Sequence, residues 1–248
     1  MKKRLIPLIL GLALPYGGAQ ADTIFGVYAG GGTQKFDFTG DFEDDAVSGT
    51  EIDLEDDLGI SDESGTYVYI ALEHPIPFIP NILLTSIEID QSASGNLQET
   101  FNGVTFNENV ESTVDLSHTD ATLYYELLDN WVNLDLGLTI RKFDGEIKLV
   151  STTSTKSAQE DIDYTIPLLY GKARFDLPLT GVYVSASGNW IGIGSNKFLD
   201  SMVTVGYEST IGLGLEAGYR NITLSIDEDD FEADLGFSGI FAAATFHF

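Results

Sequence analysis

The sequence predicts an all-β fold, a transmembrane up-and-down antiparallel β-barrel of about ten strands, with eight strands as the alternative. Three observations predict it: apolar and polar residues alternate with period two, long and short connections alternate, and the last strand ends on Phe248. A barrel strand in a membrane turns every second side chain to lipid and the others to the lumen, so it needs this alternation.

Composition limits the remaining classes of protein. The chain has 248 residues, no cysteine and a formal net charge of −27. The lack of cysteine excludes a disulfide framework and a thiolate metal site. The acidic charge disfavours nucleic acid as a partner, since phosphate binding needs a basic face. Disorder is not expected, because 43% of the residues are hydrophobic and 11% are aromatic.

The N-terminus carries the features of a signal peptide. Lys2, Lys3 and Arg4 precede an apolar run over 5–14, which is too short to span a bilayer. Ala19-Gln20-Ala21 has the small-x-small pattern of a cleavage site, although an uncleaved anchor is the alternative. We therefore expect a signal peptide at 1–21 and a barrel domain at 22–248, exported to the cell outer membrane.

Ten strands are expected along the mature chain. Long, mostly acidic connections are predicted near 39–64, 91–112, 145–161, 194–200 and 227–233, and short ones at 75–81, 129–130, 177–180 and 208–211. Outer-membrane barrels have long extracellular loops and short periplasmic turns, and an even strand count returns both termini to the periplasm. The expected strands are 23–36, 65–74, 82–90, 113–127, 131–144, 162–176, 181–193, 201–207, 212–226 and 234–248.

The alternation is clearest in 131–144 and is disturbed in two other strands. In 162–176, Lys172 and Arg174 share a face with apolar residues such as Leu168. In 212–226, Ile222, Leu224 and Ile226 share a face with Glu216 and Arg220. Each strand therefore needs a bulge, for which Pro167 is a plausible cause, or has an outer half beyond the hydrocarbon.

The last strand resembles the signal that the barrel assembly machinery recognises. Phe248 ends it, and apolar residues alternate back from that position: Phe246, Ala244, Ala242 and Ile240. We expect this machinery and periplasmic chaperones to be partners during biogenesis.

The N-terminal third resembles a family of small proteobacterial outer-membrane β-barrel proteins without assigned activity. The similar segments are the glycine-rich 25–32 (FGVYAGGG), the acidic 52–59 (IDLEDDLG) and 71–75 (ALEHP). The resemblance implies a barrel in the outer membrane and carries over no catalytic residue.

Charged residues within the predicted strands are expected to line the lumen. A cationic side chain facing lipid at the midplane costs about 2–4 kcal/mol, so inward placement next to carboxylates is favoured. The predicted lumen-lining residues are Glu88, Asp120, Glu126, Asp135, Arg141, Lys172, Arg174, Glu216 and Arg220.

No catalytic site is predicted, and we expect no enzyme and no cofactor. Ser117 and His118 are neighbours on opposite faces of a strand, so they cannot pair as nucleophile and base. His118 is expected to lie in a solvated loop.

The first acidic loop contains the weak metal-ligand candidates Asp53, Glu55, Asp56 and Asp57. Hard cations prefer such oxygens, but the segment is not an EF-hand, because Leu58 stands where glycine is needed. A solvated acidic loop is the favoured interpretation.

Two classes of function remain open. One is a passive barrel, either a narrow pore or a closed structural barrel. The other is a surface interaction module that acts through acidic extracellular loops on divalent cations or lipopolysaccharide. We expect a monomer in contact with outer-membrane lipid and lipopolysaccharide, and no nucleic acid.

The mature chain is predicted to begin at Asp22, because the peptidase cleaves after the Ala19-Gln20-Ala21 pattern. The intact mass of protein extracted from outer membranes measures this directly. A mass that includes residues 1–21 would contradict the prediction.

Overall fold

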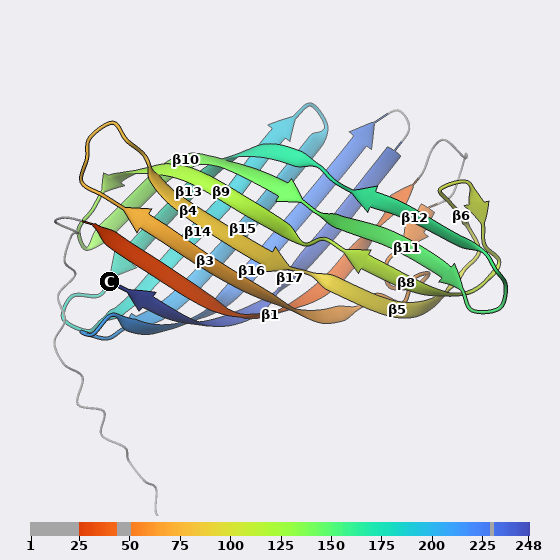
Figure 1. Cartoon of the computed structure of the whole chain (residues 1–248), viewed down its shortest axis with the longest axis horizontal. Helices are drawn as coiled ribbons and strands as arrows, with labels where there is room; N and C mark the ends of the chain where they lie inside the picture. Colours follow the sequence, from red (N-terminus) through yellow and green to blue (C-terminus); the bar gives the residue numbers. More distant parts are fainter. Residues whose placement is uncertain (1–24, 44–50, 229–230) are drawn as a thin grey trace, which may run out of the picture.

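Ten strands form a closed antiparallel barrel in the computed structural model, which describes residues 25–43, 51–228 and 231–248 (Figure 1). Each strand pairs with the next, and β17 pairs with β1 to close the sheet. The barrel strands are β1 (Gly26–Glu43), β3 (Asp62–Glu73), β4 (Asn81–Glu88), β9 (His118–Leu128), β10 (Val132–Phe143), β13 (Thr165–Asp176), β14 (Val182–Ile193), β15 (Asn196–Glu208), β16 (Leu213–Glu228) and β17 (Phe231–His247).

The predicted ten-stranded barrel is confirmed, and the alternative of eight strands is wrong. The predicted signal peptide (1–21) lies outside the described residues. Among the residues that are described, no helix is long and apolar enough to cross a membrane.

The outer surface of the barrel is apolar, as period-two alternation requires. In β10, Leu136, Leu138 and Ile140 point outwards and are 50%, 59% and 49% exposed, whereas Asp135 and Arg141 are buried inside. An exposed apolar belt flanking a polar interior is the arrangement of a transmembrane barrel.

Two of the predicted long loops are strands, which corrects the sequence-based expectation. Residues 91–112 and 145–161 lie largely in β5 (Asp90–Leu97), β8 (Glu108–Asp115), β11 (Gly145–Ser151) and β12 (Ser157–Ile162). These four strands form a second sheet that prolongs one wall of the barrel (Figure 1, right). Polar outward residues made these segments resemble loops, but their inward residues, among them Leu97, Val110 and Leu149, are buried.

The predicted long loop at 194–200 is also wrong. It is a two-residue turn at Gly194 and Ser195, after which β15 begins at Asn196. Gly194 has a φ of +64°, a left-handed conformation that glycine adopts without steric cost.

The second sheet, together with β2 (Glu51–Asp53), the segment 54–61 and the hairpin of β6 (Thr100–Phe101) and β7 (Val104–Thr105), is called the extension below. The opposite end of the barrel is called the turn end; it holds the turns near 129–131, 177–181 and 209–212 and the C-terminal residue Phe248. The hairpin reaches the second sheet, where the Asn102 side-chain amide donates to Gln159 O at 2.7 Å.

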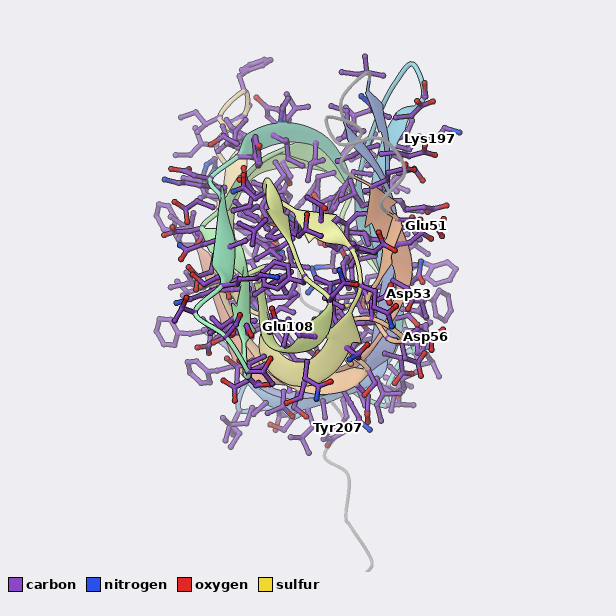
Figure 2. The ribbon with its side chains drawn as sticks, turned by 90° about the vertical axis from the view of Figure 1, so that its right-hand side faces the viewer. Glu51, Asp53, Asp56, Glu108, Lys197 and Tyr207 are labelled. Carbon is purple, nitrogen blue, oxygen red and sulfur yellow. The ribbon has the colours of Figure 1, made fainter. Side chains whose placement is uncertain are left out.

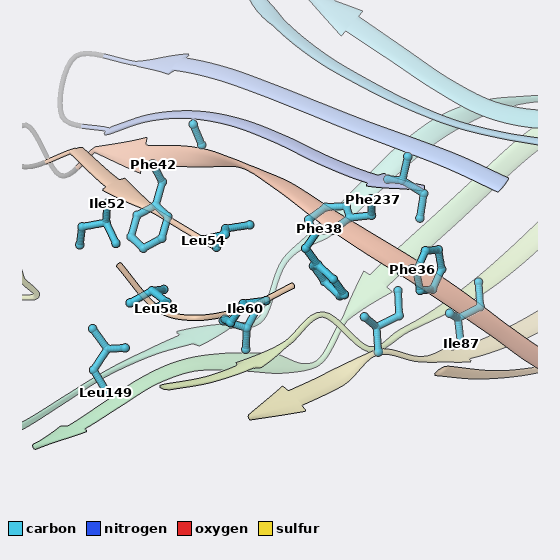
Figure 3. Close-up of a cluster of buried hydrophobic side chains, with 14 of the residues drawn as sticks. Phe36, Phe38, Phe42, Ile52, Leu54, Leu58, Ile60, Ile87, Leu149 and Phe237 are labelled. Atoms are coloured by element: carbon cyan, nitrogen blue, oxygen red, sulfur yellow. The ribbon is translucent and has the colours of Figure 1, made fainter. Parts of the chain in front are cut away.

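An apolar core fills the extension and continues into the adjacent half of the barrel (Figure 3). Leu58 and Ile60, from the segment after β2, are fully buried between residues of the barrel wall and Leu149 of the second sheet. Other members are Phe36, Phe38, Phe42, Ile52, Leu54, Leu97, Phe101, Phe106 and Phe237. This end of the lumen is therefore occupied by side chains.

The same core explains the two disturbed strands. Leu168 is buried on the inner face of β13, the face that also carries Lys172 and Arg174, and Ile222 is buried on the inner face of β16. The β10–β13 register runs without a shift through Pro167, which is opposite Ile140. No register shift interrupts the pairing of β13 with β10 or of β16 with β15 and β17, so the bulge, one of the two expected explanations, is absent from these pairings. The alternation is disturbed because the interior itself changes from polar to apolar along each strand.

Deleting Phe248 is predicted to impair assembly. The Val27 amide donates to Phe248 O at 2.8 Å, and the Phe248 amide donates to Val27 O at 2.9 Å, so this residue completes the seam between the first and last strands. We expect lower outer-membrane levels and more periplasmic degradation, measured by fractionation and immunoblotting. Substitution of Phe78, which is 94% exposed in a turn away from the seam, is the control. Unchanged levels after the deletion would contradict the prediction.

Candidate functional site: the barrel lumen

A chain of four charged residues crosses the lumen between two walls of the barrel. Arg141 of β10 donates from Nε and Nη2 to the two oxygens of Asp120 on β9, both at 2.7 Å. The same Nη2 donates to Asp200 Oδ2 on β15 at 2.7 Å, and Arg220 Nε of β16 donates to Asp200 Oδ1 at 2.8 Å. Asp120, Arg141, Asp200 and Arg220 are called the ion chain below.

The ion chain is buried. Arg141 is fully buried, and Asp200 is 3% exposed. The rings of Phe143 and Phe198 cover the Arg141 guanidinium, with centroids 6.0 and 5.2 Å from its central carbon. Two guanidinium groups balance two carboxylates, so each buried charge is compensated, which such burial demands. Bidentate pairing fixes the geometry, because the planar guanidinium fork matches a carboxylate.

Neutral polar groups continue this layer across the lumen. The Thr122 and Thr139 hydroxyl oxygens are 2.7 Å apart, and Thr139 Oγ1 donates to Asn189 Oδ1 at 2.7 Å. Arg220 Nη1 donates to Gln34 Oε1 at 3.3 Å. The polar layer therefore ties the inner faces of β1, β9, β10, β14, β15 and β16 together below the apolar core.

Between the ion chain and the turn end lies a vestibule of two adjoining cavities. The inner chamber has a volume of about 180 Å³ and reaches Asp120, Asp200 and Arg220; the outer mouth, near Trp131 and Phe248, has about 980 Å³. The two cavities share lining residues: Tyr28, Glu73, Lys172, Arg174, Glu208 and His247. Tyrosines and carboxylates dominate the walls.

Several vestibule charges are already paired. Arg174 donates from Nη2 to Asp176 Oδ1 at 2.8 Å, lies 3.8 Å from Glu208 Oε2, and stacks over the Tyr183 ring at 3.7 Å. The His247 ring nitrogen Nδ1 is 3.0 Å from Glu208 Oε1. The Tyr124 hydroxyl donates to Glu73 at 2.6 Å, and the Tyr183 hydroxyl donates to Glu216.

Eight of the nine predicted lumen-lining residues face the interior. Asp120, Arg141 and Arg220 belong to the ion chain, and five line the vestibule: Glu126, Asp135, Lys172, Arg174 and Glu216. Glu88 is wrongly placed: it lies on the outer face of β4 with Ile82 and Leu84, where Thr66 Oγ1 donates to it at 2.8 Å. Glu88 has the same sequence parity as Ile82 and Leu84, so its side chain points to the same outer face. It lies at the end of β4 beside the extension, where Thr66 is a polar neighbour.

Sequence reasoning missed Asp200 and the buried His118. Asp200 was assigned to a loop, although the alternation of Phe198, Asp200 and Thr204 already marked an inward face. His118 is 4% exposed inside the barrel rather than in a solvated loop, with Nδ1 2.9 Å from Leu116 O and its ring 5.2 Å from the Phe143 ring. The Ser117 hydroxyl accepts the Ile89 amide, so these neighbours form no catalytic pair.

The acidic segment after β2 uses its carboxylates to hold its own backbone. Asp53 Oδ1 accepts the amides of Glu55 and Asp56 at 2.8 and 2.7 Å, and Asp57 Oδ2 accepts the Asp53 amide at 2.9 Å. Glu51, Asp53 and Asp56 lie along one side of the rim of the extension (Figure 2). Within the described part of the chain, no three acidic or histidine side chains converge as a metal site would require.

Several solved structures are similar to this chain. The outer-membrane protease OmpT of Escherichia coli superposes with a TM-score of 0.54 at 9% identity, over 91% of this chain and 97% of OmpT. The Yersinia pestis attachment invasion locus protein Ail gives 0.40 at 11% identity, over 90% and 100% of the two chains. The translocator domain of the Neisseria meningitidis autotransporter NalP gives 0.39 at 13%, over 89% and 88%.

No protein-family model and no curated protein matches the sequence. The likeness to OmpT shows the fold, and at 9% identity it shows nothing about activity.

Asp200→Asn is predicted to destabilise the barrel strongly. It leaves two buried arginines with one carboxylate, and removing one member of a buried ion pair costs about 3–5 kcal/mol. The free energy of unfolding, measured by urea titration of protein refolded in vesicles, tests this. Lys142→Gln is the matched control, since it breaks an exposed pair with Asp163 at 3.5 Å and costs about 0–1 kcal/mol. Equal effects of the two substitutions would contradict the role of the ion chain.

Proposed function

We propose that the protein is a closed outer-membrane barrel that conducts no solute and displays the extension at the cell surface. The observation that carries the proposal is the filled lumen. The apolar core occupies the extension and the barrel half beside it, and the ion chain lies directly beneath. A solute passing through would have to break buried ion pairs and separate packed side chains, both of which are costly.

The fold and the surface support this location and orientation. The exposed belt of Leu136, Leu138 and Ile140 matches the lipid-facing band of outer-membrane barrels. Val27 of the first strand and Phe248 after the last strand pair at the turn end, and in outer-membrane barrels with an even number of strands this end faces the periplasm. The extension then projects outwards among lipopolysaccharide. We propose a monomer, inserted by the barrel assembly machinery with the help of periplasmic chaperones.

The order of the extension favours a surface interaction module as its second role. A mere connection needs no core, yet Leu97, Phe106 and Val110 are fully buried within the extension. Glu108 is similarly held: the hydroxyls of Thr153 and Ser151 donate to it and lower its pKa to about 2. Lys156 Nζ lies 3.2 Å from the same carboxylate. Such an ordered surface is preorganised for a partner, which reduces the entropy lost on binding.

No catalytic role is part of the proposal. The Ser117 hydroxyl accepts the Ile89 amide, and the His118 ring nitrogen Nδ1 lies 2.9 Å from Leu116 O, so the two side chains bond to the backbone and not to each other. Within the ion chain, both carboxylates are paired with arginines of the chain.

Planar-bilayer recordings test the closed barrel. Because packed side chains block the path, we expect no steady, solute-sized current steps from the inserted protein. Insertion is verified in parallel by protection of the barrel from protease in vesicles. Reproducible conductance steps from verified insertions would contradict closure and would favour the narrow pore.

A further inference from the structure

The vestibule at the turn end carries an unbalanced negative charge. Arg174 is engaged by Asp176 and Glu208. Arg220, which also lines the inner chamber, is held by Asp200. Other carboxylates line the chamber or the mouth, among them Glu73, Glu126, Asp135 and Glu216. Lys172 is the one further lysine or arginine of those walls among the described residues. Its Nζ lies 4.0 Å from Asp135 Oδ2, a loose contact. A cleft of one charge sign with low-dielectric walls concentrates ions of the opposite sign.

Three buried polar atoms in the vestibule lack a partner within the described residues: Gln34 Nε2 in the inner chamber and two others. Asp135 Oδ1, on a side chain that is 5% exposed, accepts no hydrogen bond and lines the outer mouth. The Tyr67 hydroxyl, on a residue that is 6% exposed, has no partner and lines the inner chamber. Buried polar atoms are rarely left unsatisfied, so each indicates a place for a polar ligand group. The carboxylate can accept from a donor, and the hydroxyl can both donate and accept.

The walls between these two positions are aromatic. Tyr69, Tyr124 and Tyr170 line the inner chamber, with the last two rings 5.8 Å apart. The contact of Arg174 with Tyr183 already shows a cation held over a tyrosine face in this vestibule. Aromatic faces attract cations and also contact methylene groups.

The chamber suits a small organic cation better than a metal ion. Among the described residues no three acidic or histidine side chains are grouped closely enough to hold a metal. The chamber volume of about 180 Å³ is below the roughly 300–1,000 Å³ of sites for drug-sized ligands. Its anionic groups are spread along the axis, from Asp135 in the mouth to Glu216 in the chamber, which fits a ligand with a charge at each end.

We propose that the vestibule binds a linear aliphatic diamine or polyamine from the periplasmic side. One ammonium group donates to Asp135 Oδ1 beside Glu73, the methylene segment lies against the tyrosine rings, and the other ammonium group donates to Glu216 and the Tyr67 hydroxyl. The ion chain closes the inner end of the site, so the ligand is held and not passed on.

Calorimetric titration of diaminobutane into the refolded mature chain tests the site, with butanediol as the uncharged ligand of the same length. Saturable binding of the diamine and none of the diol is expected. Asp135→Asn keeps the shape but removes the charge, so affinity should fall at least about tenfold, the effect of losing a charge-assisted hydrogen bond. Tyr67→Phe should weaken binding by a smaller factor.

Glu88→Gln is the matched control, because it removes a carboxylate from the outer face and should leave affinity unchanged. Circular dichroism establishes that each variant is folded; if Asp135→Asn does not fold, Tyr67→Phe decides. Any of three results would overturn the proposal. The first two are no saturable binding of the diamine and equal binding of the diol. The third is selective displacement by magnesium, in which magnesium chloride releases the diamine and sodium chloride at the same ionic strength does not. Bilayer conductance is a separate measurement, so closure and binding can fail independently.

Discussion

Two arginines and two aspartates, buried between opposite walls of the barrel, form the interaction on which the arrangement of the lumen depends. Arg141 reaches both Asp120 and Asp200, and Asp200 also holds Arg220, so each strand contributing a charge is tied to the others. If one of these charged side chains pointed outwards, it would lie in lipid, which costs free energy. The inward register of β9, β10, β15 and β16 is therefore fixed by chemistry as well as by backbone pairing.

The ion chain also separates two different interiors. On the extension side the lumen is packed with apolar side chains such as Phe36, Phe38 and Ile87, as the interior of a soluble protein would be. On the turn side it holds tyrosines, carboxylates and cavities. A lumen that changes in this way cannot follow one inside–outside rule along a whole strand. This change from polar to apolar explains why the alternation is disturbed in β13 and β16.

The amino-acid pattern predicted a closed barrel and most of the inward charges, and the inward charges follow from period two. It left the strand count open between ten and eight. It failed where outward residues are polar beyond the hydrocarbon. In the extension, the sequences of four strands resemble those of loops: β5, β8, β11 and β12. Their inward residues, such as Leu97 and Leu149, pack against segments that are distant in the sequence. Asp200 is absent from the predicted lumen-lining residues for a related reason, because the predicted loop at 194–200 covers the start of β15. Glu88 was a plain error of alternation. Pairing partners across the lumen, such as Asp200 with both arginines, depend on barrel closure and are not encoded in local sequence.

The two ends of the protein are built for different purposes. At the extension, Asp53 and Asp57 accept backbone amides and so hold a turn. Two of the four predicted metal-ligand candidates therefore have a structural role. At the turn end, Asp135 Oδ1 and the Tyr67 hydroxyl are buried without a partner among the described residues, and their residues line cavities. Desolvating a carboxylate oxygen without a donor costs stability. The ion chain balances its own charges, although Arg141 Nη1 has no partner among the described residues, whereas Asp135 has only the loose contact with Lys172. This difference in charge balance is the reason for proposing a cationic ligand at the turn end.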